Sequence, residues 1–447
     1  MNMEKEYDYI IVGTGPGGAT IAKELAAIKK RVLMIEYGPR LNVTGFMKIG
    51  RNKIFRDDNN NPLRSEEGIW IGRARMLGGS SYVAMGNAVT PPISILNEWG
   101  IDLSRELESA RKDLRVNLIP DSFIGPATTK INQGAISLGW DMKPTPKCVD
   151  FNKCQACGMC MFGCPHGAKW TTLEFVEDAI KNRAHLLLNT EVIRVTHKNG
   201  QATGVNAVQG KNQIELHARN VVLAAGGIGT PIILQNSDIS EAGKGLALDI
   251  FQTTYGYSDF IGMKNEIILA TYLEKHIEEK ELFAAPYVYL PILVAMYSKD
   301  QRSTQMNLIN QMRLVLESTR VNTKHLLGMM TKIRDERTGQ VMHDGRIHKT
   351  VTERDKAKLD EAHEINKQIL IVAGAKPETI FHTAYESGHP ACTAAIGEII
   401  NRNQESQIKG LFVSDASAFP TPLGMPPILT IVALSKRLAN LLIRFQS

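Results

Sequence analysis

The N-terminal region of this chain contains a strand, turn, helix and strand pattern that limits its fold more than any other feature. An apolar run, Tyr7–Val12, is followed by a glycine-rich turn at residues 13–18 and then by apolar residues at helical spacing. A second apolar run, Val32–Ile35, ends at an acidic residue. This order of elements is typical of the first unit of a parallel, nucleotide-binding sheet.

The glycines of this turn have separate roles in such a unit. Gly13 permits the tight turn, Gly15 lets the backbone approach a pyrophosphate, and Gly18 allows the helix to pack closely on the strand. The phosphates then lie at the helix N-terminus, where free amides and the helix dipole favour negative charge. Glu36, about 20 residues further on, is placed to accept hydrogen bonds from an adenosine ribose. The pattern predicts a dinucleotide site, but it does not distinguish FAD from NAD.

Later segments are expected to complete the same sheet. Apolar strands are predicted at residues 185–188, 190–195, 220–227 and 410–415. Apolar residues from Ile428 onward mark one face of a closing helix, and Pro427 is a good helix start. The fold class is therefore α/β, with a Rossmann-like domain assembled from separated segments and a second α+β domain.

Composition excludes several classes of protein. The 447 residues include 43% hydrophobic residues, which is enough for a sizeable core, and the net charge of +6 comes without a concentrated basic stripe, so nucleic acid is not an expected partner. The N-terminus lacks the apolar region of a signal peptide, which predicts a cytoplasmic protein. Residues 283–297 are uncharged but interrupted by prolines, so they are expected to form a buried strand pair or line a cavity and not to cross a membrane.

Five motifs in order give the chain a resemblance to the glucose–methanol–choline (GMC) family of FAD-dependent oxidoreductases. They are the N-terminal glycine motif with Glu36, and residues 72–81, 225–231, 388–393 and 415–434. The resemblance covers most of the chain and implies that FAD is the dinucleotide. By this resemblance the ADP half contacts Gly13, Gly15, Gly18 and Glu36, the adenine lies near Val192, the phosphates and flavin lie near Gly78, Gly79 and Ser80, and the flavin end lies near Asp415, Met425 and Pro426.

The resemblance also implies a catalytic histidine. In the matching segment this residue is His389, and His382 just upstream is a weaker candidate. A neutral imidazole suits the task, because the proton of an alcohol hydroxyl must leave as hydride passes to the flavin.

Two positions depart from the family pattern. Pro426 stands where the family usually has an Asn or a second His, so the usual catalytic pair is in doubt. Cys392 stands where the pattern has a Gly, and it is expected to be a buried small hydrophobe and not a reactive thiol.

Five of the six cysteines lie between Cys148 and Cys164. The spacing of Cys154, Cys157, Cys160 and Cys164, followed by a proline, is that of a bacterial ferredoxin run. It predicts a four-iron or three-iron cluster, with Cys148 competing with Cys164 as the fourth ligand. Zinc is the alternative, although structural zinc sites usually separate two cysteine pairs by a longer loop.

A cluster beside a flavin favours a dehydrogenase over an oxidase, since the cluster can pass electrons singly to an external carrier. The expected activity is oxidation of an alcohol, polyol or sugar hydroxyl, with a ferredoxin, cytochrome or quinone-linked partner as acceptor. The same machinery running backwards would reduce a carbonyl or an activated alkene. A non-catalytic electron-transfer subunit is a further alternative, which Pro426 favours and His389 opposes.

The predicted organisation divides the chain into five parts. These are FAD-binding segments at residues 1–115, 181–250 and 376–447, a cysteine-rich insert at 116–180, and a substrate domain at 251–375.

Overall fold

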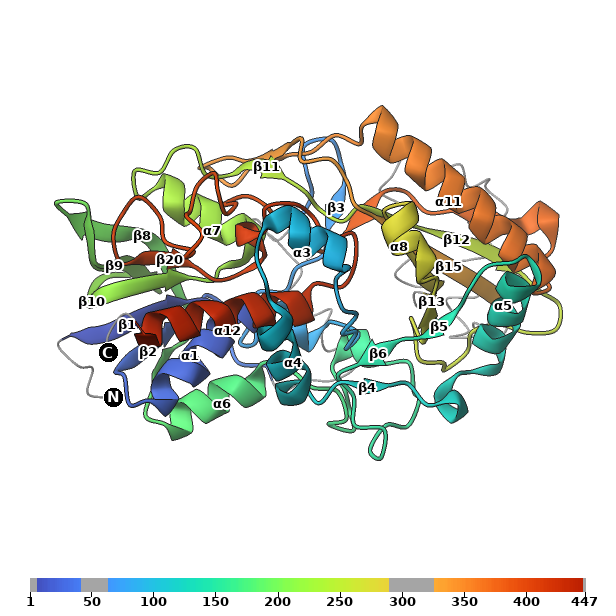
Figure 1. The fold of residues 1–447 in the computed structure, drawn as a ribbon, viewed down its shortest axis with the longest axis horizontal. Coiled ribbons are helices and arrows are strands. Elements are labelled where there is room, and N and C mark those ends of the chain that lie inside the picture. The colour runs from blue at the N-terminus through green and yellow to red at the C-terminus, as the bar shows by residue number, and fades with distance from the viewer. Residues whose placement is uncertain (1–5, 42–62, 289–324, 445–447) are drawn as a thin grey trace.

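The computed structural model describes residues 6–41, 63–288 and 325–444. Figure 1 shows two sheet-containing parts joined side by side, with the N- and C-termini near the first of them. The first part contains a seven-stranded sheet and the second a six-stranded sheet.

The seven-stranded sheet has a parallel core in the spatial order β7, β2, β1, β10 and β20. On β10 it continues into an antiparallel extension formed by β9 and β8. β1 and β2 are almost entirely buried and apolar, as parallel strands covered on both faces must be. The bounds are β1 (Tyr7–Val12), β2 (Val32–Ile35), β7 (His185–Leu187), β8 (Thr190–Lys198), β9 (Gln201–Gln209), β10 (Asn212–Leu223) and β20 (Leu411–Val413).

Helices cover this sheet. α1 packs against both α12 and α6, α12 also contacts α4, and α7 packs against β8. α1 begins with Pro16 in its first turn, where the missing N–H of proline costs nothing. The bounds are α1 (Pro16–Ala27), α4 (Ser104–Asp113), α6 (Leu173–Lys181), α7 (Gly226–Gln235) and α12 (Ile428–Arg444).

The six-stranded sheet has the order β14, β15, β12, β19 and β3, with β18 also paired to β12. α11 (Glu353–Val372) packs on β12 and β15, and it starts with a capping box between Thr352 and Asp355. The bounds are β3 (Trp70–Ile71), β12 (Phe251–Tyr257), β14 (Leu282–Pro286), β15 (Leu326–Ile333), β18 (Phe381–His382) and β19 (Glu386–Ser387).

The remaining elements are short. The helices are α3 (Ile93–Trp99), α5 (Pro126–Ser137), α8 (Lys275–Glu279), η1 (Gly79–Tyr82), η2 (Asp121–Phe123), η3 (Cys160–Phe162), η4 (Pro377–Thr379) and η5 (Ala416–Ala418). The strands are β4 (Asn117–Leu118), β5 (Lys143–Pro144), β6 (Pro146–Lys147), β11 (Lys244–Leu246), β13 (Thr271–Tyr272), β16 (Gly339–Val341) and β17 (Ile347–His348).

Strands are found at each of the predicted places, 185–188, 190–195, 220–227 and 410–415, and the closing helix is confirmed. The bounds predicted for the third strand are wrong, because β10 runs from Asn212 to Leu223 and the glycines at 226–227 begin α7. The six-stranded sheet also contains three strands from outside the predicted range 251–375, namely β3, β18 and β19. The sequence did not predict them, because each has only two residues and leaves no periodic signal. Residues 282–286 form β14, whereas residues 289–297 of the uncharged stretch lie outside the described residues. Within the described ranges, no helix is long and apolar enough to cross a membrane.

Candidate active site

A cavity of about 430 Å³ lies where the two parts of the molecule meet. Its walls come from the glycine-rich turn, the start of α1, segment 72–87 and the start of α7 on one side. On the other side it is lined by residues of β12 and β15 and by the segment 387–390. The cavity therefore connects the predicted dinucleotide site with the predicted catalytic histidine.

The glycine-rich turn is packed so tightly that side chains are excluded at three positions. A Cβ at Gly13 would lie 2.3 Å from Ala224 O, one at Gly17 would lie 1.6 Å from Ser414 O, and one at Gly18 would lie 2.0 Å from Gly13 O. Gly15 differs, because a Cβ there would meet no atom within 4 Å. Gly15 thus faces open space in the cavity, at the N-terminus of α1.

Glu36 joins the glycine-rich turn to the end of β2. Its Oε2 accepts hydrogen bonds from Thr14 N at 3.0 Å and Thr14 Oγ1 at 2.6 Å, and its Oε1 accepts one from Gly38 N at 2.9 Å. Burial raises the pKa of Glu36, against the effect of these hydrogen bonds. The carboxyl group lines the cavity and at the same time fixes the turn.

Gly78 and Gly79 lie beside the glycine-rich turn. A Cβ at Gly79 would lie 3.1 Å from Gly15 Cα, so the two backbones approach closely. Gly78 lies behind this contact, and its N–H donates to Thr14 Oγ1 at 3.0 Å. Ser80 lines the cavity, and its Oγ accepts a hydrogen bond from Ala74 N.

The remaining predicted contacts surround the same cavity. Asp415 lines it, and its Oδ2 accepts hydrogen bonds from Gly226 N at 2.8 Å and Thr230 Oγ1 at 2.6 Å. Val192 and Pro426 also line the cavity. Met425 is fully buried and, like Gly18 and Gly78, is not among the lining residues.

His389 lies at the far end of the cavity, and its side chain is 24% exposed. Its Nδ1 is 3.0 Å from Oδ2 of Asp249, a carboxylate that is only 3% exposed. Burial holds the pKa of His389 well below its usual range, and the nearby Lys332 adds to this effect. Burial also raises the pKa of Asp249 to about 7, although Lys332 opposes the rise. His382, the weaker candidate, is not among the lining residues.

Three ionisable residues around His389 were missed from the sequence. Lys332 lies 3.4 Å from His389 Nδ1, measured from Nζ, and lines the cavity, and burial lowers its pKa to about 8. Asp249 and Glu386 are buried nearby, and burial raises the pKa of Glu386 to about 8. The signal for Lys332 was a single charge in the apolar run that became β15. No local pattern marks the two acids.

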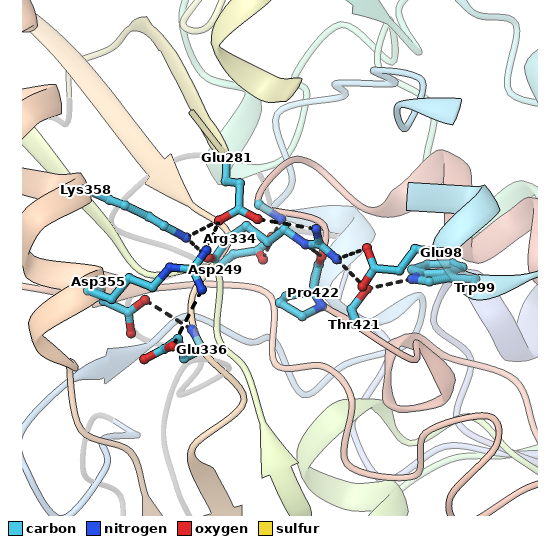
Figure 2. A network of polar contacts seen from close by, with 12 residues as sticks. Glu98, Trp99, Asp249, Glu281, Arg334, Glu336, Asp355, Lys358, Thr421 and Pro422 are labelled. Carbon is cyan, nitrogen blue, oxygen red and sulfur yellow. Dashed lines mark hydrogen bonds and ion pairs between the residues drawn. The ribbon is translucent and has the colours of Figure 1, made fainter. Parts of the chain in front are cut away.

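A network of polar contacts holds the turn before α12. Pro426 is part of this turn. Figure 2 shows Arg334 at the centre of this network. Its Nε donates to Pro422 O at 2.9 Å, and its Nη2 donates to Thr421 Oγ1 at 2.7 Å and to Glu98 Oε2 at 2.6 Å. Asp249 Oδ1 accepts a hydrogen bond from Gly424 N at 3.0 Å. The acid that contacts His389 is thereby tied to the turn.

Cys392 is fully buried, as predicted, and burial raises the pKa of its thiol. Its φ is +69°, in the left-handed region that favours glycine. This conformation explains why a glycine occupies the matching position of the family pattern.

The four cysteines of the ferredoxin-like run line one small pocket, together with Lys169 and Ile267. Cys148 is buried elsewhere and is not among the lining residues. The Sγ of Cys164 accepts a hydrogen bond from Ala168 N at 3.3 Å. In the described part of the chain, no three His, Cys, Asp or Glu residues are close enough to hold one metal ion. The described structure therefore does not itself support the predicted iron–sulfur cluster.

The two pockets are joined by one buried lysine. Lys169 Nζ donates to Cys160 O at 2.9 Å, Tyr82 O at 2.7 Å and Ala84 O at 2.6 Å. Met161, next to Cys160, lines the large cavity. The cysteine-rich segment is thus in direct contact with the glycine–serine segment of the cavity.

Family models describe both halves of this chain. A model described as GMC oxidoreductase matches residues 7–251, and a second with the same description matches residues 290–435. The chain belongs to the GMC oxidoreductase family.

Individual proteins are similar to most of this chain. An uncharacterized protein of Methanocaldococcus jannaschii is 26% identical to this GMC oxidoreductase over 96% of its chain and 98% of the relative. A long-chain-alcohol oxidase of Arabidopsis thaliana is 24% identical over 97% of this chain and 68% of the relative. The crystal structure of pyridoxine 4-oxidase from Mesorbium loti has the same fold, with a TM-score of 0.73, 15% identity and coverage of 98% of this chain and 99% of that one.

The FAD that membership of this family implies fits the residues present. The GMC oxidoreductase has open space at Gly15, the first turn of α1 has no side-chain cap on its amides, and Gly79 faces Gly15 without a side chain between them. Free amides and bare backbone are what a pyrophosphate requires.

Proposed function

We propose that this GMC oxidoreductase binds FAD and oxidises an alcohol, polyol or sugar hydroxyl, and that the electrons leave through an iron–sulfur cluster to an external carrier such as a ferredoxin, a cytochrome or a quinone-linked subunit. The observation that carries the proposal is the pair of His389 and Asp249 in the same cavity as the glycine-rich turn. The name of the Arabidopsis relative, a long-chain-alcohol oxidase, supports an alcohol as substrate.

The predicted contacts that line the cavity would hold the cofactor. We place its phosphates over Gly15 and Gly79 at the N-terminus of α1 and its flavin end near Pro426 and His389. When bound, FAD supplies the acceptor for the hydride of the alcohol carbon.

His389 would take the hydroxyl proton at Nε2. With a proton on Nδ1, the ring donates to Asp249, which leaves Nε2 as an acceptor facing the substrate. The lowered pKa of His389 keeps the ring neutral and able to accept a proton at pH 7. Asp249 would hold the ring orientation and stabilise the imidazolium that forms. A non-catalytic electron carrier has no use for such a pair.

The proposed cluster would be held by Cys154, Cys157, Cys160 and Cys164. The spacing of these four cysteines, followed by Pro165, is that of a bacterial ferredoxin run, and all four line one pocket. The spacing suits zinc less well, because structural zinc sites usually separate two cysteine pairs by a longer loop. The N–H donated to Cys164 Sγ is of the kind that tunes cluster potentials. The position of Cys148 outside the pocket favours Cys164 as fourth ligand.

Anaerobic purification tests this function. We expect a flavin spectrum, three or four irons per chain, and bleaching of the flavin by at least one compound in a panel of alcohols, polyols and sugars. Bleaching in the absence of oxygen, followed by reoxidation by a one-electron carrier, would support a dehydrogenase. If no alcohol reduces the flavin while a ferredoxin exchanges electrons with it, the protein is an electron-transfer subunit and the proposed activity is wrong.

A further inference from the structure

Lys332 occupies an unusual position for a charged side chain. In the six-stranded sheet it pairs in register with Phe251 of β12, and Phe251 pairs with Glu386 of β19. Residues in register on neighbouring strands present their side chains on the same face of a sheet. Lys332 Nζ lies 4.7 Å from the ring centroid of Phe251, and both side chains line the cavity. An ammonium group is therefore held at the cavity wall by an aromatic ring.

The hydrogen-bonding capacity of this ammonium group is largely unused. Lys332 is 5% exposed, and an ammonium carries three N–H donors. Within the described ranges its one close polar contact is with His389 Nδ1, at 3.4 Å, and a proton on Nδ1 that is donated to Asp249 leaves that nitrogen unable to accept from the ammonium. No carboxylate of these ranges lies within the 4.0 Å that defines an ion pair with Lys332. A buried charge with so few partners is costly unless a ligand completes its coordination.

The acids around Lys332 do not fill this role. Asp249 contacts His389 through Oδ2 and Gly424 through Oδ1. Asp335 forms an ion pair with Lys349 at 2.7 Å. Glu386 has an Oε2 without a hydrogen-bond partner, and because burial raises its pKa to about 8 it is mostly neutral at pH 7.

We propose that Lys332 binds the carboxylate of the substrate, so that the alcohol oxidised is a hydroxy acid with its carboxylate next to the hydroxyl-bearing carbon. The distance of 3.4 Å between Lys332 Nζ and the His389 ring supports this class, because ammonium and imidazole can then contact adjacent groups of one small molecule. Lys332 takes no part in proton or hydride transfer and acts on binding and orientation. The inference rests on the proposed alcohol oxidation and names its substrate class.

Binding of an unreactive hydroxy acid tests the inference separately from turnover. The probe is 2-hydroxyisobutyrate, which has no hydrogen on its carbinol carbon, and the control is its uncharged amide. Both are titrated into oxidised, FAD-loaded protein and followed by calorimetry and by the flavin difference spectrum. We expect the acid to bind at least about 10-fold more tightly than the amide, because only the acid supplies a charge for Lys332.

Three variants complete the experiment. Lys332→Met and the second neutral variant Lys332→Gln should remove the preference for the acid and leave FAD content unchanged. Met330→Leu, an uncharged change in the same strand and cavity, should keep the preference. Equal affinities for acid and amide in the wild type, or a preference that survives in the folded neutral variants, would overturn the inference. Loss of FAD from folded neutral variants would overturn it too, because Lys332 would then serve the flavin.

Failure of the role proposed for Lys332 can be distinguished from failure of the proposed alcohol oxidation. If an uncharged alcohol bleaches the flavin but the acid shows no preference, alcohol oxidation stands and the role of Lys332 is wrong. If the acid binds through Lys332 but neither alcohols nor hydroxy acids bleach the flavin, carboxylate binding stands and alcohol oxidation is wrong.

Discussion

The carboxylate of Asp249 joins His389 to the turn before α12. One oxygen lies 3.0 Å from His389 Nδ1, and the other accepts a hydrogen bond from Gly424 N at 3.0 Å. Pro426 lies two residues beyond Gly424 and offers no side-chain donor or acceptor. The polar side chain next to His389 is therefore that of Asp249, while position 426 supplies none.

Removing the base should slow only the reaction with substrate. His389→Ala is expected to reduce the rate of anaerobic flavin reduction by about 10²–10⁴-fold, since one positioned base contributes about that factor. FAD content and reduction of the cluster by dithionite should stay at wild-type levels, because neither needs the base. Asp249→Asn should also lower the rate, by up to about 10⁴-fold, because an asparagine can leave the imidazole in the wrong tautomer. Stopped-flow absorbance of the flavin measures both effects.

Pro426→Asn is the control for this pair. It restores the polar group that the family usually has, and we expect it to be tolerated or to raise the rate. A wild-type rate in His389→Ala with a confirmed substrate would show that the catalytic assignment is wrong.

Two glycines of the turn should respond in opposite ways to added side chains. Gly15→Val should fold normally, because its φ of −66° is accessible to any residue and its Cβ meets open space, but it should lose FAD because the side chain enters the cavity. Gly17→Ala should destabilise the fold, since its Cβ would lie 1.6 Å from Ser414 O. Flavin content and the unfolding midpoint distinguish the two outcomes. Stoichiometric FAD in the Gly15 variant would contradict the placement of the pyrophosphate.

The iron content of two variants should show whether Cys164 or Cys148 is the fourth ligand of the proposed cluster. Cys164→Ser should lower the iron content of anaerobic protein, whereas Cys148→Ser, which changes a thiol outside the cysteine pocket, should keep it. Iron and zinc are measured by elemental analysis on protein of confirmed fold. Stoichiometric zinc with negligible iron in the wild type would show that the cluster assignment is wrong.

The strand, turn and helix on the glycine-rich side of the cavity could be predicted from the sequence, because their signals are local. Gly13, Gly15 and Gly18 lie within six residues, and the strand before them and the helix after them have clear periodicity. His389 was identified through a motif and not through its surroundings. It does lie in the cavity.

The surroundings of His389 are less predictable, because distant strands assemble them. Asp249 comes to His389 from a position 140 residues away. Lys332 reaches it only because β15 pairs with β12, which pairs with β19. Strand pairing of this kind depends on contacts between segments that are far apart in the sequence. Periodicity along the chain does not predict which strands pair.

The pH dependence of flavin reduction should show the ionisation of both Asp249 and Lys332. Burial raises the pKa of Asp249 to about 7, so below that pH the carboxyl is protonated and cannot stabilise an imidazolium on His389. The rate with an uncharged alcohol should therefore rise with pH through about 7 and then level off. With a hydroxy acid the apparent affinity should fall above about pH 8, because Lys332, whose pKa burial lowers to about 8, loses its charge.

Measuring the same pH profile in two variants checks the direction of both expected changes. In Asp249→Asn the rise through about pH 7 should disappear. In Lys332→Met the fall for hydroxy acids should disappear, and the rise should move to higher pH, because the charge of Lys332 lowers the pKa of Asp249 in the wild type. Rates are measured under anaerobic conditions by stopped flow between about pH 5 and pH 9, a range that spans both titrations. A rate that decreases through about pH 7 in the wild type would contradict the assignment of Asp249 as the ionised partner of the base.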